Sequence, residues 1–151
     1  MTSNRPVALI TGASSGLGFE FACQLAEDDH DLVLVARGDG ALRRQARELE
    51  ANHGILAMPV AIDLSRPGAA EELWRRIAAT TRGVNVLINS AGIGVAETFA
   101  YSDPDTTQAM LELNINALTT LTRKALPGML ERRYGRILNV SSVAGYRAGG
   151  R

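Results

Sequence analysis

The chain has 151 residues, of which 46% are hydrophobic, enough for one domain with a buried core. Sixteen basic residues balance sixteen acidic ones, and this zero net charge argues against a nucleic-acid surface or an anionic-membrane partner. No apolar run is long enough to cross a bilayer, and the N-terminus lacks the apolar segment of a signal peptide. A single cysteine, Cys23, cannot form an internal disulfide. We therefore expect a cytoplasmic protein of one domain.

Five apolar runs of strand length recur along the chain, and helical patterns separate them. Most runs are apolar throughout, as expected for parallel strands covered on both faces. The alternation predicts right-handed βαβ units in an open, doubly wound sheet of strand order 3-2-1-4-5. The expected strands are 7–10, 32–36, 55–62, 84–88 and 137–140, and the expected helices are 17–28, 40–52, 69–80 and 104–133.

The turn between the first strand and the first helix reads TGASSGLG, from Thr11 to Gly18. Backbone N–H groups at a helix start have no intrahelical partner, and the helix dipole adds partial positive charge there. Glycines let the backbone approach a phosphate closely. The spacing matches neither G-x-G-x-x-G nor a Walker loop. The turn therefore predicts a pyrophosphate site, with a glycine-rich turn that binds nothing as the alternative.

The end of the second expected strand favours one nicotinamide coenzyme. An NAD-selecting site has Asp or Glu about 20 residues beyond the glycines, where it binds the ribose 2′-hydroxyl. Position 36 is alanine here, and Arg37 follows, whose guanidinium can hold a 2′-phosphate. The pattern favours NADP over NAD. The alternative is a surface arginine, and Asp39 is close enough in the chain to compete for it.

Polar residues also follow the third and fourth expected strands, at the sheet edge where ligands bind in such folds. Asp63 either accepts a hydrogen bond from an adenine amino group or forms an Asx turn. Ser65 is then expected to cap a helix that Pro67 begins. Asn89 is expected to tie the fourth strand to its neighbour. Small residues after Asn89 let a cofactor pass over the backbone.

The long helix expected over 104–133 begins with Asp103 as its cap and Pro104 as its first residue. Pro127 is expected to kink or end this helix. Its apolar positions cover more than one narrow stripe, so we expect it to pack on the sheet and on a second partner. The two histidines, His30 and His53, have no neighbouring ligands, and no metal site is predicted.

From Val7 to about Gly145 the chain resembles the short-chain dehydrogenase/reductase family of NAD(P)-dependent oxidoreductases. The resemblance rests on the TGASSGLG turn, Asp63-Leu64, NSAG at 89–92, Asn114 with Pro127 thirteen residues on, and GRILNVSSVAG at 135–145. It implies a Rossmann-type domain and hydride transfer between NADP(H) and a carbonyl or alcohol substrate.

The resemblance also implies residue roles. Ser142 would orient the substrate carbonyl, and Asn114 would hold a proton-relay water. The implied cofactor-binding residues are Gly12, Ser14, Ser15, Gly16, Leu17, Gly18, Arg37, Asp63, Leu64, Asn89, Ala91 and Gly92.

The sequence departs from the family pattern at two places. Ser90 stands where the family usually has the second asparagine of NNAG. The family's Tyr-x-x-x-Lys, whose tyrosine lies thirteen residues after Ser142, is absent because the sequence ends at Arg151. A tyrosine donates a proton near neutral pH only where a nearby cation lowers its pKa from about 10.

These departures shape what we expect of residues 1–151. We expect a single, incomplete Rossmann domain that is inactive alone, with an exposed fifth strand. The intact form is expected to be a homo-oligomer through the 104–133 helix. The alternative function is a non-catalytic NADP(H)-binding module or subunit.

Overall fold

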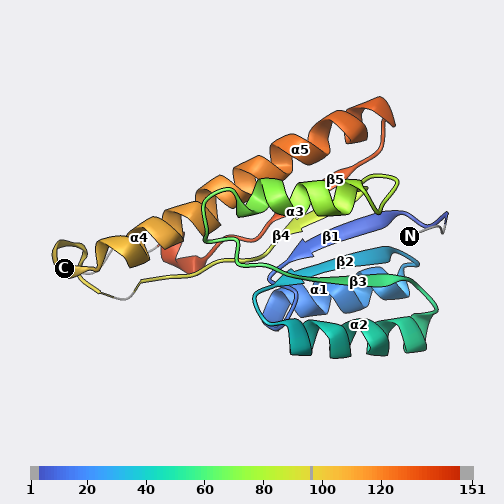
Figure 1. Ribbon diagram of the computed structural model, residues 1–151, viewed down its shortest axis with the longest axis horizontal. Coiled ribbons are helices and arrows are strands. Elements are labelled where there is room, and N and C mark those ends of the chain that lie inside the picture. Colours follow the sequence, from blue (N-terminus) through green and yellow to red (C-terminus); the bar gives the residue numbers. More distant parts are fainter. Residues whose placement is uncertain (1–3, 96, 147–151) are drawn as a thin grey trace.

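The computed structural model describes residues 4–95 and 97–146, and its strands form one parallel sheet in the predicted order, β3-β2-β1-β4-β5. Helices α1 and α2 cover one face, and α3 and α5 cover the other (Figure 1). This is the predicted doubly wound, Rossmann-type arrangement. The strands are β1 Val7–Thr11, β2 Asp31–Ala36, β3 Ala57–Ala61, β4 Val86–Asn89 and β5 Arg136–Asn139.

The helices before β4 lie close to their predicted positions, whereas the predicted 104–133 helix is three segments. Asp103 caps it as expected, since its carboxylate accepts a hydrogen bond from the Thr106 N–H at 2.9 Å. Pro127 does not end the helix, which continues to Glu131. The helices are α1 Gly16–Glu27, α2 Asp39–His53, α3 Ala69–Ala78, α4 Pro104–Leu111, the π-helical η2 Glu112–Ala117 and α5 Leu118–Glu131, with 3₁₀ turns η1 Phe99–Tyr101 and η3 Val143–Tyr146.

Alternation along the strands divides the apolar residues into two cores. On β1, Leu9 faces the core beneath α3 and α5, and Ile10 faces the core beneath α1 and α2. Every residue of β1 is buried. Burial on both faces explains why the central strands read as continuous apolar runs, without a polar residue at every second position.

α3 begins at Ala69, as in the expected range 69–80, but the expected cap at Ser65 and first residue at Pro67 are wrong. Its N-cap is Gly68, with φ of +77°. Ser65 does not cap it, because its hydroxyl donates to the Asp63 carboxylate at 2.7 Å. A nearby acceptor in the same turn thus uses the side chain that was expected at the cap.

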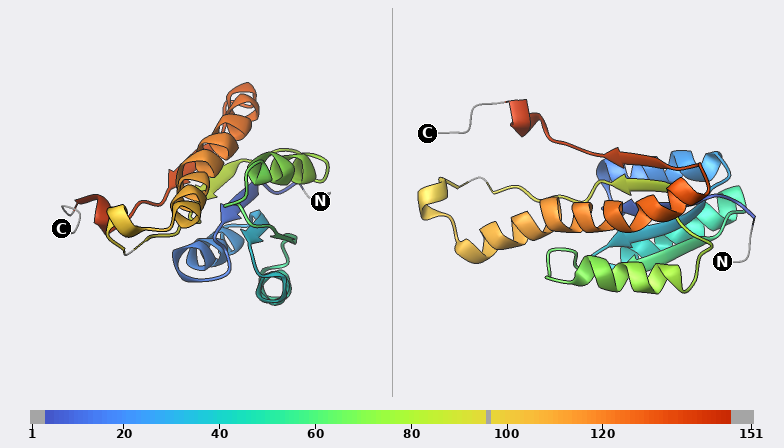
Figure 2. Two further views of the ribbon diagram at one scale, coloured as in Figure 1. Left: turned by 60° about the vertical axis from the view of Figure 1, so that its left-hand side comes forward. Right: turned by 90° about the horizontal axis from the view of Figure 1, so that it is seen from above.

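The β5 side of the molecule keeps apolar surface exposed. β5 is an edge strand, and Leu138 on it is 40% exposed. On the helices, Ile115 is 53% exposed and Leu130 is 72% exposed. Figure 2 shows α4 extending past the carboxyl ends of the strands. Pairing of the long helix with a second copy stays a prediction. None of the described helices has the length and apolarity that crossing a membrane requires.

Two leucines of α5 provide a matched test of this packing. Leu121 is fully buried and Leu130 is 72% exposed, so Leu121→Ala should lower the free energy of unfolding by about 2–5 kcal/mol. Leu130→Ala should change it by less than about 0.5 kcal/mol. Urea denaturation of both variants measures the difference, and equal losses would contradict the burial described here.

Candidate functional site

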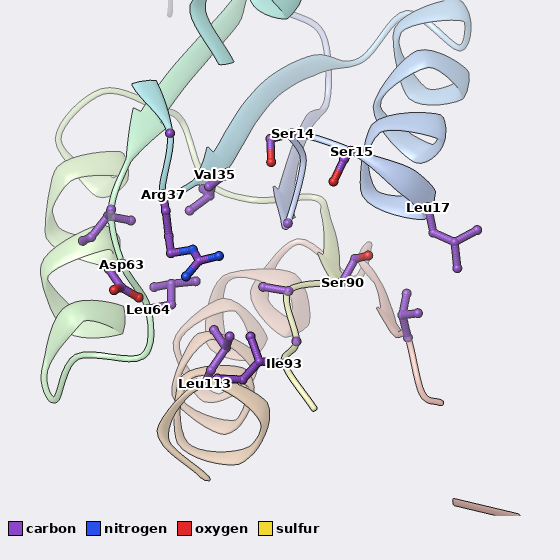
Figure 3. Close-up of a pocket in the computed structure, with 17 residues that line it drawn as sticks. Ser14, Ser15, Leu17, Val35, Arg37, Asp63, Leu64, Ser90, Ile93 and Leu113 are labelled. Carbon is purple, nitrogen blue, oxygen red and sulfur yellow. The ribbon is translucent and has the colours of Figure 1, made fainter. Parts of the chain in front are cut away.

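A cleft of about 530 Å³ lies at the carboxyl ends of the strands, within the roughly 300–1,000 Å³ range of small-molecule sites. Figure 3 shows side chains from β2, the glycine-rich turn and the segments after β3 and β4 converging on it. The predicted site residues that line it are Gly12, Ser14, Ser15, Leu17, Arg37, Asp63, Leu64, Ala91 and Gly92.

Gly12 allows the glycine-rich turn to pack against the segment after β4, and Gly18 allows α1 to pack against the turn. Gly12 has φ of +70°, and a Cβ there would lie 2.9 Å from the Ala91 backbone nitrogen. A Cβ on Gly18 would overlap the Gly12 carbonyl oxygen. Both positions therefore require glycine for close backbone contact, and Gly12 requires it for its conformation as well.

The N-terminus of α1 opens at this turn, where Gly16 is its first residue. Its N-cap, Ser15, makes no side-chain capping bond, and its first turn carries no acidic residue. The first backbone bond into the helix joins the Phe19 N–H to the Ser15 carbonyl at 3.4 Å. The preceding N–H groups of the first turn can therefore bind an anion beside the cleft.

Thr11 ties the turn to the segment after β4. Its buried hydroxyl accepts hydrogen bonds from the Ser90 and Ala91 N–H groups, both at 3.1 Å, and donates to the Ile88 carbonyl at 3.4 Å. The sequence pattern alone does not assign this positioning role to Thr11. A polar residue at the end of a fully apolar run was the feature that pointed to it.

Arg37 reaches over the cleft on the side of Asp63 (Figure 3). The competition expected from Asp39 does not occur, because that carboxylate pairs with Arg43 at 2.7 Å, one helical turn along α2. Arg37 is exposed, so its charge can meet a ligand anion at the cleft entrance.

Asp63 forms the Asx turn that was one of its two predicted roles. Its Oδ1 accepts hydrogen bonds from the Ser65 N–H at 3.0 Å and the Ser65 hydroxyl at 2.7 Å. The hydroxyl bond, with smaller contributions from the Ser65 N–H and the charges of Arg37 and Arg66, holds the pKa of Asp63 below its usual value. Both bonds end on Oδ1, which leaves Oδ2 for a ligand in the cleft.

Asn89 ties β4 to its neighbours, as predicted. It is buried, and its Nδ2 donates to Asn139 Oδ1 on β5 at 2.9 Å and to Thr122 Oγ1 on α5 at 3.2 Å. Asn89 does not line the cleft directly. Its position at the end of β4 instead fixes the segment from which Ala91 and Gly92 face the cleft.

The two residues expected to be catalytic lie outside the cleft lining. Both polar atoms of the Asn114 side chain bond to the Ile93 backbone: Oδ1 accepts from N–H at 3.0 Å, and Nδ2 donates to the carbonyl at 2.8 Å. Ser142 is exposed, and its Oγ accepts from the Ala144 N–H at 3.1 Å. Their catalytic roles stay predictions.

Ala36 and Ser90 also line the cleft, and the other additional lining residues were not singled out in the sequence because most resemble core positions. Apolar residues at strand ends cannot be distinguished from core residues by pattern alone. The additional lining residues are Val35, Ala36, Gly38, Ile62, Ser90, Ile93, Leu113 and Val140.

No metal centre is found in the part of the chain that the structure describes, where no three potential His, Cys, Asp or Glu ligands come together. Cys23 is partly buried against the core beneath α1 and α2. Burial, together with the charges of Glu20 and Glu27, raises the pKa of its thiol and disfavours the reactive thiolate.

Known proteins resemble this chain over nearly its whole length. A family model described as short chain dehydrogenase matches residues 6–150. A very-long-chain 3-oxoacyl-CoA reductase from Anas platyrhynchos is 35% identical over 144 residues, covering 91% of this chain and 45% of that protein. A 2-dehydro-3-deoxy-L-rhamnonate dehydrogenase (NAD(+)) from Sphingomonas sp. (strain SKA58) is 35% identical over 139 residues, covering 91% and 54%.

A solved structure shows the same likeness in three dimensions. The short-chain dehydrogenase from Sphingobium yanoikuyae in complex with NADPH superimposes with a TM-score of 0.86 at 35% identity, covering 93% of this chain and 55% of that one. The chain thus spans about half the length of the curated relatives it matches.

The contact between the glycine-rich turn and the segment after β4 can be tested by substitution. Gly12→Ala should lower the free energy of unfolding by at least about 1–2 kcal/mol, because its φ is positive and its Cβ meets the Ala91 backbone. Gly40→Ala in α2 is the control, since a Cβ there meets nothing within 4 Å. Thermal unfolding of the two variants measures the effect, and an unaltered Gly12→Ala protein would contradict this geometry.

Proposed function

The chain belongs to the short-chain dehydrogenase family, whose members are NAD(P)-dependent oxidoreductases, and we propose that its cleft binds NADP(H) in preference to NAD(H). The observation that carries this proposal is Arg37 at the cleft entrance, directly after β2, with alanine where an NAD-selecting carboxylate would stand. One similar protein is named for NAD(+) and another was solved with NADPH, so the local residues must decide the preference.

The described residues fit a dinucleotide. The pyrophosphate of the coenzyme would accept hydrogen bonds from the first-turn N–H groups of α1. No acidic side chain in that turn competes for these groups. The close packing of Gly12 on Ala91 leaves the turn free of side-chain bulk at that point. The Arg37 guanidinium would donate hydrogen bonds to a 2′-phosphate, and Asp63 Oδ2 would accept a hydrogen bond from the adenine amino group.

For the intact protein, we infer hydride transfer between the nicotinamide and a carbonyl or alcohol substrate. The bound coenzyme supplies or accepts the hydride. Ser142 would orient the substrate oxygen. The Asn114 side chain forms two hydrogen bonds to the backbone of Ile93, a residue that lines the cleft. Asn114 would thereby position the segment that contacts the nicotinamide.

The second candidate function is a non-catalytic NADP(H)-binding module or subunit. It is favoured by one observation: residues expected to hold the nucleotide line the cleft, whereas Asn114 and Ser142, the residues expected to be catalytic, lie outside its lining.

Nucleotide titration tests the proposed role of Arg37 in the preference for NADP(H). Arg37→Ala should weaken NADPH binding about ten- to hundredfold, the effect of losing hydrogen bonds to a charged group, and change NADH affinity by less than about threefold. The matched control is Arg47→Ala, which removes the same charge from an exposed position of α2 outside the cleft. If NADPH and NADH affinities fall equally in Arg37→Ala, the proposed selection is wrong.

Turnover tests whether the 151 residues catalyse hydride transfer by themselves. We expect the purified chain to bind NADPH yet to leave a panel of aldehydes and ketones unreduced, because it lacks the family's tyrosine–lysine pair. NADPH absorbance at 340 nm measures this, with a full-length family member as the positive control. Oxidation at rates typical of that enzyme would show that other residues donate the proton.

A further inference from the structure

The side chain of Gln45 on α2 forms a hydrogen bond to the backbone of the glycine-rich turn. Its Nε2 donates to the Ser14 carbonyl at 3.0 Å, across 31 residues of sequence. Its Oε1 is buried and has no hydrogen-bond partner among the described residues. The side chain thus makes one long-range bond and leaves its other polar atom unpaired.

An unpaired buried amide oxygen destabilises a fold, because that atom loses its hydrogen bonds to water and gains none in return. The same space would suit an apolar side chain of similar length, since neighbouring α2 positions Leu42, Ala46 and Leu49 pack into the core. The polar side chain at position 45 is therefore poorly explained by stability. Its one bond, to the glycine-rich turn, is the feature that needs an amide.

This bond fixes the orientation of one peptide group beside the cleft. No cis peptide is present among the described residues, so the C=O of Ser14 and the N–H of Ser15 point in opposite directions. With the carbonyl directed at α2, the Ser15 N–H is directed away from α2. Ser14 and Ser15 both line the cleft (Figure 3).

The backbone ties of the turn lie on either side of this peptide. The Ala13 N–H donates to the Val35 carbonyl at 3.1 Å, and the Phe19 N–H donates to the Ser15 carbonyl at 3.4 Å. The Ser14–Ser15 peptide itself is held by the Gln45 side chain. A turn held in its binding orientation before the ligand arrives loses less entropy when it binds.

We propose that Gln45 is a positioning residue for nucleotide binding. It orients the Ser14–Ser15 peptide toward the pyrophosphate, the group that NADPH and NADH share. The inference rests on the proposed function of the cleft. It differs from the role of Arg37, because it concerns the part common to both nucleotides. Gln45 thus sets overall affinity, while Arg37 sets the preference between them.

Gln45→Met tests this role, because methionine keeps the length of the side chain and removes its donor. We expect about three- to tenfold weaker binding of both NADPH and NADH, the effect of one hydrogen bond, with an unchanged ratio of the two affinities. The melting temperature of the free protein should stay the same or rise, since the unpaired Oε1 is removed as well. Gln45→Leu is a second variant, and Glu48→Met, exposed on the same helix, is the control.

Three results would overturn the proposal. Wild-type affinity in Gln45→Met and Gln45→Leu would show that the bond to Ser14 does not matter for binding. A fall in melting temperature together with affinity would show that Gln45 is a structural residue. If the wild-type protein binds neither nucleotide, the proposed function itself fails, and this result is distinct because it does not depend on any variant.

Discussion

The hydroxyl of Thr11 is the contact on which the geometry of the cleft depends. It brings the end of β1 against the segment after β4 by accepting two backbone N–H groups at 3.1 Å. The strand order places β1 next to β4, and the cleft forms at that pair because the connections diverge to opposite faces of the sheet there. The close approach then excludes any side chain at position 12. The Thr11 hydroxyl and the glycine at position 12 are therefore both required for β1 to lie this close to the segment after β4.

Two side chains with buried amide atoms, those of Gln45 and Asn89, join segments around the cleft. Gln45 joins α2 to the glycine-rich turn, and Asn89 joins β4 to β5 and α5. Each of these two side chains also leaves an oxygen buried without a partner among the described residues. Buried polar atoms are normally paired, so their occurrence at these two residues indicates that the geometry of the site is maintained at some expense of stability.

Coverage of the sheet is uneven, so the two sides of the proposed site differ in how well they are packed. β1 and β2 are buried almost throughout, whereas most of β5 is exposed, as are Leu130 on α5 and the 3₁₀ residues Val143 and Tyr146. The nucleotide side of the proposed site therefore stands on the well-packed half of the sheet. Ser142, the residue proposed to meet the substrate, lies on the poorly packed half.

The sequence by itself determined the strand order, the helix positions, the glycine-rich turn and the edge of the sheet where the cleft lies. These features depend on local periodicity and on short segments whose chemistry is carried by neighbouring residues. It did not determine the π-helical segment 112–117, the N-cap of α3, the pairing of Asp39 with Arg43, or the roles of Thr11 and Gln45. Some of these depend on which of several nearby partners a polar group takes, and others on contacts between residues 31 to 80 positions apart. Only the folded chain brings those partners within hydrogen-bonding distance and decides between them.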